Sequence, residues 1–162
     1  MSYEISPARS EEEAALCALF EAYYEELRAL GMNYALNRDK LPEVIRSRIR
    51  SRMFTFPVAR TEEGEIAGFL MGSVHRLGGE YLSEGSAAVG FLHEMYVLPA
   101  HRRRGLAQRL LCALEDWLRA QNVSALELHV LEQNQGARAL YLAEGFRPIA
   151  SILTKTLDGK ET

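Results

Sequence analysis

The chain has 162 residues, of which 48% are hydrophobic and 25% are charged, and its formal net charge is −3 at pH 7. These values are those of a soluble globular protein, and they suit one domain, residues 1–162, with a core of ordinary size. No window is apolar enough to span a membrane, and the net charge gives no sign of a nucleic-acid binder. We therefore expect neither a membrane nor a nucleic acid among the partners.

The N-terminus and the two cysteines indicate where the chain works. Residues 1–4 show neither the basic nor the apolar stretch of a secretory leader, so we expect a cytoplasmic protein. Cys17 and Cys112 lie far apart in the sequence without the spacing of metal ligands. Their pattern predicts two reduced thiols and no metal site.

The N-terminal third predicts a strand and two helices. Residues 3–5 form a short strand, and Ser10 with Glu13 has the spacing of a capping box that starts a helix. The apolar stripe of that helix ends before Gly31, a residue type suited to the position after a helix end. A second helix is predicted over residues 41–53.

Both helices are rich in charge, and two interpretations of that charge are open. The glutamates of the first helix could attract a cationic substrate, and the arginines of the other helix could form a basic patch. Side chains that serve only to solvate a helix face are the more common case, and we favour that interpretation for both helices. The residues concerned are Glu11, Glu12, Glu21, Glu25 and Glu26, and then Arg46, Arg48, Arg50 and Arg52.

The middle of the chain predicts an antiparallel hairpin and a central strand. Residues 56–60 and 66–75 are rich in β-formers and are joined by a turn that contains Gly64. Residues 77–88, with several glycines and serines, form the longest predicted loop. The central strand follows over residues 89–97.

An arginine-rich loop follows the central strand and leads into a helix with a regular apolar stripe. The first backbone N–H groups of such a helix are unpaired, and with the positive end of the helix dipole they form an anion site. Gly105 lets a phosphate approach the backbone, and residues 102–104 add three positive charges. The loop lacks the glycine spacing of a P-loop or of a dinucleotide-binding loop.

Two motifs show which family the chain resembles. Arg102, Gly105 and Ala107 form R-x-x-G-x-A after the strand sequence LHEMYVLP, which closely resembles the acetyl-CoA signature of the GNAT superfamily of N-acetyltransferases. Residues 134–146 fit the second motif of that family, N-x-x-A-x-x-x-Y-x-x-x-G-F, at every fixed position. Because the two motifs occur in the right order and are separated by one strand, the resemblance is specific over residues 91–146.

The remaining elements agree with the fold that this resemblance implies. A strand is predicted at residues 126–130, a helix at 135–144 and a closing strand at 146–156. Together the elements predict an α/β fold, with a GNAT-type mixed, mostly antiparallel sheet and helices on both faces. In that fold the central strand and its successor are parallel and splay apart, and the cofactor lies between them.

The resemblance also implies which residues bind acetyl-CoA, the expected co-substrate. Backbone groups of the central strand would hold the pantetheine arm and polarise the thioester, and amides of the loop would hold the pyrophosphate. Asn134 would anchor the pantetheine, with Ala137 at the same wall. The strand residues are Met95, Tyr96 and Val97, and the loop residues are Arg102, Arg103, Arg104, Gly105, Leu106, Ala107 and Gln108.

Two side chains are candidates for the catalytic proton transfers. Tyr141 matches the general acid of the family, although a tyrosine on a helix can also serve packing alone. Glu94 is the best candidate base, because a carboxylate in an apolar strand is costly to bury unless it faces a wet cleft. His93 competes for this role, but strand alternation places it opposite Glu94 unless a bulge intervenes. His129 would more often be a packed histidine.

The expected activity is transfer of the acetyl group of acetyl-CoA to a primary amine by direct attack in a ternary complex. The expected acceptor is a small-molecule or peptide amine, and no residue of the sequence identifies which one. The sequence also leaves open whether the chain forms a homodimer. In the family, the first two helices and the variable loops set the substrate, here Tyr24, Tyr34 and residues 77–88. The alternatives are a coenzyme A-binding regulatory module without turnover and a small dinucleotide-binding protein.

Overall fold

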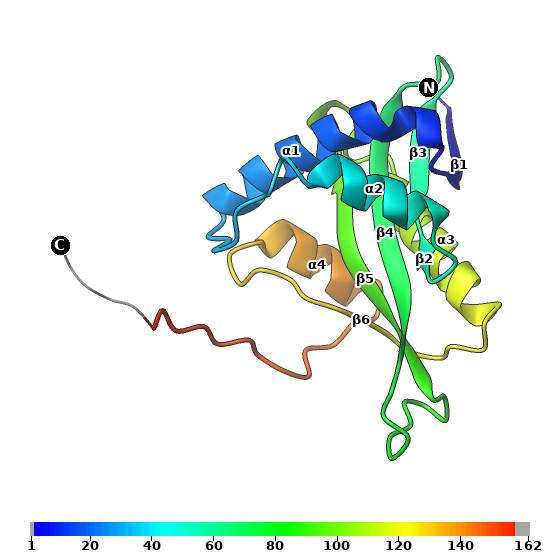
Figure 1. Ribbon diagram of the computed structural model, residues 1–162, viewed down its shortest axis with the longest axis vertical. Coiled ribbons are helices and arrows are strands. Elements are labelled where there is room, and N and C mark those ends of the chain that lie inside the picture. Colours follow the sequence, from blue (N-terminus) through cyan, green and yellow to red (C-terminus); the bar gives the residue numbers. More distant parts are fainter. Residues whose placement is uncertain (1, 158–162) are drawn as a thin grey trace.

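The structure is a computed structural model, and it describes residues 2–157. Its centre is a mixed sheet of six strands in the order β1-β3-β4-β5-β6, with β2 paired to β4 (Figure 1). The helices are α1 (Glu13–Ala29), α2 (Leu41–Arg50), α3 (Leu106–Arg119) and α4 (Gln135–Ala143). The strands are β1 (Tyr3–Pro7), β2 (Phe54–Thr55), β3 (Pro57–Thr61), β4 (Ile66–Arg76), β5 (Ala88–Val97) and β6 (Leu126–Leu128).

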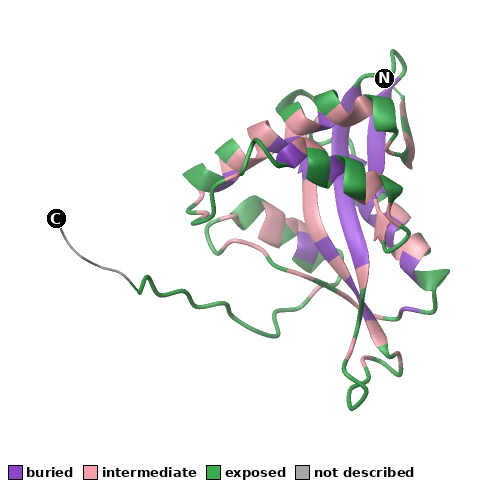
Figure 2. Ribbon diagram, viewed as in Figure 1, coloured by how far each residue is buried: buried purple, intermediate pink, exposed green. Residues whose placement is uncertain are grey.

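Side-chain alternation along β4 divides the core into two layers. Phe69 packs in the layer that contains Leu16 of α1 and Ile45 of α2, whereas its neighbour Leu70 packs in the layer that contains Leu114 of α3. Figure 2 shows that β3 and β4, between these layers, are buried over most of their length. The predicted mixed α/β fold with helices on both faces of the sheet is therefore confirmed.

Helix α3 packs directly against two strand residues that have no side chain. A Cβ atom built on Gly72 would lie 2.5 Å from Leu114, and one built on Gly90 would lie 2.4 Å from Leu118. A larger residue at either position would push α3 away from the sheet. These glycines therefore set the position of α3 and of the loop that leads into it.

Only one pair of neighbouring strands is parallel among the described residues. β5 pairs with β6 over Gly90–Leu92, and all other paired strands are antiparallel. β5 continues to Val97, five residues beyond its last partner in β6. The two parallel strands therefore part after Leu92, as predicted, and one backbone edge of β5 is left without a strand partner.

One extra residue in β5 interrupts its ladder with β4. Met71 lies opposite Glu94 and Gly72 lies opposite Leu92, so no residue of β4 lies opposite His93. This is the pattern of a β-bulge. The bulge that would bring the two candidate bases to one face is therefore present.

The predicted capping box at the start of α1 is wrong. Ser10–Glu12 form a 3₁₀ turn, and the Arg9 backbone N–H donates to the carboxylate of Glu12 at 2.7 Å. Glu13 begins α1, and its carboxylate accepts hydrogen bonds from Arg46 of α2. The predicted capping box would instead have joined this carboxylate to the backbone N–H of Ser10. A partner from another helix thus competes with the local cap.

Several predicted element bounds are also wrong. Helix α2 ends at Arg50 because Ser51 is extended, with a ψ of 135°, so residues 51–53 lie outside it. The strand predicted over residues 56–60 is preceded by a separate short strand, β2, that pairs with β4. β6 ends at Leu128, two residues earlier than predicted.

The largest error concerns the closing strand predicted over residues 146–156. Within the described part of the chain, this segment joins no sheet, and Figure 1 shows it leading away from the body. Its apolar side chains are exposed, with Ile149 at 75%, Ile152 at 63% and Leu153 at 93%. β-propensity alone does not make a strand, and the short β6 offers only three paired residues as a template.

A buried ion pair fixes the start of α1 to the sheet. Arg60 of β3 is 3% exposed and donates hydrogen bonds to both carboxylate oxygens of Glu12, each at 2.7 Å. It also donates to the Pro7 carbonyl at 2.9 Å and to the Ser6 hydroxyl. Burial would raise the pKa of Glu12, but the hydrogen bonds from Arg60 and Arg9 outweigh burial and hold this pKa below its usual value.

We predict that Glu12→Gln lowers the free energy of unfolding by about 3–5 kcal/mol at pH 7, because the buried Arg60 charge loses its partner. The lowered pKa means that the ionised carboxylate stabilises the fold above its unfolded pKa and loses this effect as the pH falls through the folded pKa. The difference between variant and wild type should therefore shrink below about pH 4. Urea unfolding at both pH values measures it.

Glu11→Gln is the matched control, since Glu11 is the exposed neighbour of Glu12. Its stability should stay within about 0.5 kcal/mol of wild type. A Glu12→Gln protein as stable as wild type at pH 7 would show that α1 is not held by this pair.

Candidate active site

The loop between β5 and α3 presents a row of free backbone N–H groups. The first backbone hydrogen bond of α3 joins the Arg109 N–H to the Gly105 carbonyl, at 3.1 Å. No acceptor among the described residues binds the N–H groups of residues 103–108. Arg103 and Gly105 both have positive φ angles, 61° and 74°, and alternating conformations of this kind gather successive amides around one point. The loop and the helix dipole together can hold an anion.

The surroundings of Gly105 leave room for that anion. A Cβ atom built on Gly105 would meet no other atom within 4 Å, and the residue is exposed. Arg103 and Arg104 are exposed beside it, and neither forms an ion pair with a described residue. Two positive charges are therefore available next to the amides, as a pyrophosphate requires.

Arg102 is placed differently from its two neighbours. Its Nε donates to the Val97 carbonyl at 2.8 Å, and its terminal nitrogen donates to both carboxylate oxygens of Glu26 at 2.8 Å. Glu26 also accepts a hydrogen bond from the Tyr96 hydroxyl at 2.7 Å. The Arg102 side chain thus ties the loop to α1, and it points to Glu26 instead of to the loop amides.

The backbone of β5 beyond Leu92 supplies further polar groups. In the described residues, the edge of Met95 and Tyr96 that faces away from β4 has no strand partner, because β6 has left the sheet. The Val97 carbonyl is already engaged by Arg102. An extended chain with amide groups could pair with this edge as an added strand would.

Helix α4 begins at a capped end. The Asn134 side-chain oxygen accepts a hydrogen bond from the Ala137 N–H at 3.2 Å, as an N-cap residue does. The side-chain amino group of Asn134 has no partner among the described residues and can donate to a ligand. Ala137 packs against the core layer that contains α3. The spacing of this motif is therefore set by local helix geometry.

Tyr141 of α4 is only 8% exposed, and its ring packs edge-on against Phe146, with 5.5 Å between ring centroids. Its hydroxyl makes no hydrogen bond to the described residues. Burial, and then the nearby Glu94 carboxylate, raise the pKa of Tyr141 to about 12. The phenol therefore keeps its proton at neutral pH and remains a possible donor.

Glu94 of β5 lies beneath α1. The Tyr24 hydroxyl donates to its Oε1 atom at 3.1 Å. Burial raises the pKa of Glu94, while hydrogen bonds from Tyr23 and Tyr24 limit the rise. A carboxylate with a raised pKa is a stronger proton acceptor than a solvated one, which suits a general base.

The bulge places His93 on the same face as Glu94. Its Nε2 atom lies 2.7 Å from the Ser73 hydroxyl, and its ring contacts Phe54 and Phe91. Burial, followed by the charges of His75 and Arg48, lowers the pKa of His93 to about 4. His93 is therefore neutral at pH 7, and its lowered pKa makes it a weaker proton acceptor than a free histidine.

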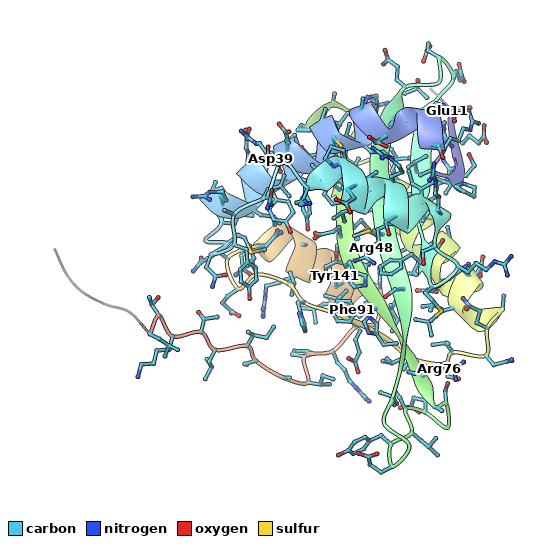
Figure 3. All side chains as sticks on the ribbon, in the orientation of Figure 1. Glu11, Asp39, Arg48, Arg76, Phe91 and Tyr141 are labelled. Atoms are coloured by element: carbon cyan, nitrogen blue, oxygen red, sulfur yellow. The ribbon has the colours of Figure 1, made fainter. Side chains whose placement is uncertain are left out.

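Sequence reasoning missed two contributors to this face. The apolar stripe of α1 includes Tyr23 as a packing residue, yet Tyr23 stabilises the ionised form of Glu94. The sequence favours a solvated face for Arg48, yet Arg48 packs over the ring of Phe54. Figure 3 shows Phe91 on β5, with Arg48 of α2 and Tyr141 of α4 in the same region of the view. The sequence does contain a signal for this contact, because an arginine can stack over an aromatic side chain such as Phe54.

Two other classes of site find no support in the described residues. Between residues 2 and 157, no helix combines the length and the apolar character that a membrane span requires. Over the same residues, no group of three or more histidine, cysteine or acidic side chains is arranged to hold a metal ion. Both cysteines are free, and they lie on α1 and α3.

Comparison with known proteins places this geometry in a family. The chain matches the model of the acetyltransferase (GNAT) family over residues 14–146. It is 40% identical over 70 residues to the mycothiol acetyltransferase of Beutenbergia cavernae. These 70 residues make up 43% of this chain but only 24% of that protein. It is 30% identical over 95 residues to an aminoglycoside N(6')-acetyltransferase type 1 of Klebsiella aerogenes, 59% of this chain and 60% of that protein.

Solved structures show the same fold. A predicted acetyltransferase from Clostridium acetobutylicum, solved with acetyl-CoA, has a TM-score of 0.76 at 15% identity, with 96% of this chain and 97% of that chain covered. The family model spans most of the chain, including the splayed strands, the anion loop and the motif of α4. The chain therefore belongs to the acetyltransferase (GNAT) family.

Proposed function

We propose that this protein transfers the acetyl group of acetyl-CoA to a primary amine by direct attack. The observation that carries the proposal is that a half-buried carboxylate, Glu94, lies close enough to the phenol of Tyr141 to help raise the pKa of this phenol to about 12. Glu94 precedes Met95 on the strand whose edge is unpaired, and the anion loop follows that strand, so a proton acceptor, a proton donor and a phosphate site would serve one reaction centre. The relatives named for N-acetyl transfer support the same activity.

The free donors of the structure fit acetyl-CoA. The amides of residues 103–108 would hold its pyrophosphate, helped by the charges of Arg103 and Arg104. The unpaired edge of Met95 and Tyr96 would bind the pantetheine amides, and the amino group of Asn134 would add a donor. The acetyl-CoA in the related Clostridium acetobutylicum structure supports this assignment.

The two side chains divide the proton transfers of the reaction. An alkylamine is mostly protonated near pH 7, so it must lose a proton before it attacks. Glu94 would take this proton, directly or through water. The amine lone pair then forms a C–N bond at the thioester carbonyl, the C–S bond breaks, and Tyr141 would give its proton to the leaving sulfur. A backbone N–H at the β5 edge would stabilise the negative oxygen.

The direct test is release of coenzyme A thiol from acetyl-CoA in the presence of different classes of amine. We expect release that depends on the amine, together with an acetylated product of matching mass. Binding of acetyl-CoA without release for any amine would instead identify a regulatory binding module. The name of the Klebsiella aerogenes relative supports a small-molecule amine as acceptor.

We predict that Tyr141→Phe lowers kcat by about 10²–10⁴-fold while acetyl-CoA affinity changes little, because the hydroxyl acts when sulfur leaves and not when the thioester binds. Steady-state kinetics and equilibrium binding on the same preparation separate the two effects. Leu142→Ala, at an exposed position of the same helix, is the control. An unchanged kcat would assign Tyr141 to packing alone.

We predict that Glu94→Gln lowers kcat/KM most near neutral pH, with a defect that shrinks as the pH approaches the pKa of the amine. At that pH the substrate arrives neutral and needs no base. In the wild type, the raised pKa of Glu94 places the acidic limb of the pH profile above the usual pH 4.5. A pH–rate series beside His93→Ala measures this, and a defect of constant size would mean that Glu94 only attracts the cation.

We predict that saturating acetyl-CoA stabilises the fold, by about 2.7 kcal/mol at a hundred times its Kd. Gly105→Asp should weaken this binding by placing charge and bulk against the pyrophosphate. Gly85→Asp is a matched control, because Gly85 also has a positive φ and open surroundings but lies before the start of β5, whereas the anion loop follows the end of that strand. Thermal-shift titration compares the three proteins, and equal affinities would move the phosphate site elsewhere.

A further inference from the structure

A continuous band of aromatic rings crosses the sheet beside Glu94. Phe54 of β2, His75 of β4, Phe91 and His93 of β5, and His129 just beyond β6 form a chain of contacts. Neighbouring ring centroids lie 4.9 to 5.7 Å apart. We call these five residues the ring wall.

The ring wall borders the reaction centre and is open to solvent. His93 and Glu94 are consecutive residues of the same bulge, and both lie on the face that α1 and α2 cover. His75 and His129 are exposed, whereas the other three rings are half-buried. A molecule whose amine reaches Glu94 therefore meets the ring wall with the rest of its structure.

One cation lies on the ring wall. The guanidinium of Arg48 stacks over Phe54, with its Cζ 3.9 Å from the ring centroid, and its charge contributes to the lowered pKa of His93. No carboxylate among the described residues pairs with Arg48, whereas Arg46 of the same helix is paired with Glu13 at 2.7 Å. A guanidinium stacked by its face keeps its N–H edge for two parallel bonds to a carboxylate or phosphate.

The same region offers little to a substrate with several positive charges. Glu21 and Glu25, near Tyr24, both face Arg38 at 3.8 and 3.7 Å. The ring wall itself contains no carboxylate. Two carboxylates remain on this face: Glu94, which is half-buried, and Glu127 of β6, which lies opposite Phe91 and is exposed. The half-buried Glu94 suits the reacting amine, and Arg48 would repel a second cation at its end of the ring wall.

We propose that the ring wall and Arg48 form the acceptor subsite, and that the acceptor is an alkylamine that carries an aromatic ring and an anionic group. The ammonium group lies at Glu94, the flat group stacks along the rings, and the carboxylate or phosphate binds Arg48. This inference rests on the proposed acetyl transfer and names the class of acceptor. It separates this chain from enzymes that act on polycationic amines.

Matched amines test the subsite. One pair is para-(aminoethyl)benzoate and para-(aminoethyl)benzamide, which differ in one charge, and another is phosphotyramine and tyramine. Kanamycin and spermidine represent polycationic acceptors. We expect kcat/KM about tenfold or more higher for the anionic member of a pair, since a hydrogen-bonded charge pair contributes at least a tenfold preference. The pair with the larger ratio identifies carboxylate or phosphate as the anion.

Arg48→Gln should abolish this preference, so that the ratio of kcat/KM between the anionic and the neutral member of each pair falls to about one. Arg52→Gln is the control, because Arg52 is an exposed arginine just beyond α2. It should keep the preference. Coincident thermal unfolding of both variants with wild type excludes a folding defect.

Two results would overturn the proposal in distinguishable ways. Turnover without preference for the anion, or with kanamycin or spermidine as the best acceptor, would overturn the acceptor subsite and leave acetyl transfer intact. Absence of thiol release with every amine would overturn acetyl transfer itself and the subsite with it.

Discussion

The bulge in β5 is the local feature on which the site depends. Without the extra residue, alternation would send either His93 or Glu94 into the apolar layer under α3. With it, both face α1 and α2, where Glu94 meets the tyrosines of α1 and His93 meets Ser73. A short distance further along the same strand, the backbone is released from β6. One strand therefore presents a carboxylate on its face and free backbone groups on its edge.

The rest of the fold holds the partners of β5 in place. Helix α1 must carry Tyr23 and Tyr24 to Glu94, and it is fixed at its start by Glu12 on Arg60 and near its end by Glu26 on Arg102. Helix α3 is held against the sheet by its close approach to two glycines, so the anion loop has a defined position relative to β5. Of these two pairs, Glu12 on Arg60 joins α1 to β3, and Glu26 on Arg102 joins α1 to the loop between β5 and α3.

Features that depend on neighbouring residues could be predicted from the sequence, and features that depend on distant partners could not. The αL residue after α1, Gly31, has a φ of 94°, and the Asn134 cap of α4 follows the motif. The bulge depends on how β4 and β5 pair, which no local pattern encodes. Local pattern favours a solvated face for the glutamates of α1, but the partners of Glu12 and Glu26 lie 48 and 76 residues away. The prediction of a closing strand was wrong for the same reason, dependence on a distant partner, since a β-prone segment needs a strand edge to pair with before it becomes a strand.

The central claim is that β5 presents Glu94 as a partly desolvated carboxylate that accepts a proton from the amine. The most direct measurement is the pKa of the Glu94 side chain, obtained by carbon-13 NMR titration with Glu94→Gln to assign its resonance. The account predicts a pKa above the usual 4.5, and a further rise in Tyr24→Phe, where the ionised form loses a hydrogen bond. A pKa at or below 4.5 would show that burial does not raise the proton affinity of this carboxylate, and it would contradict the assignment of Glu94 as the base.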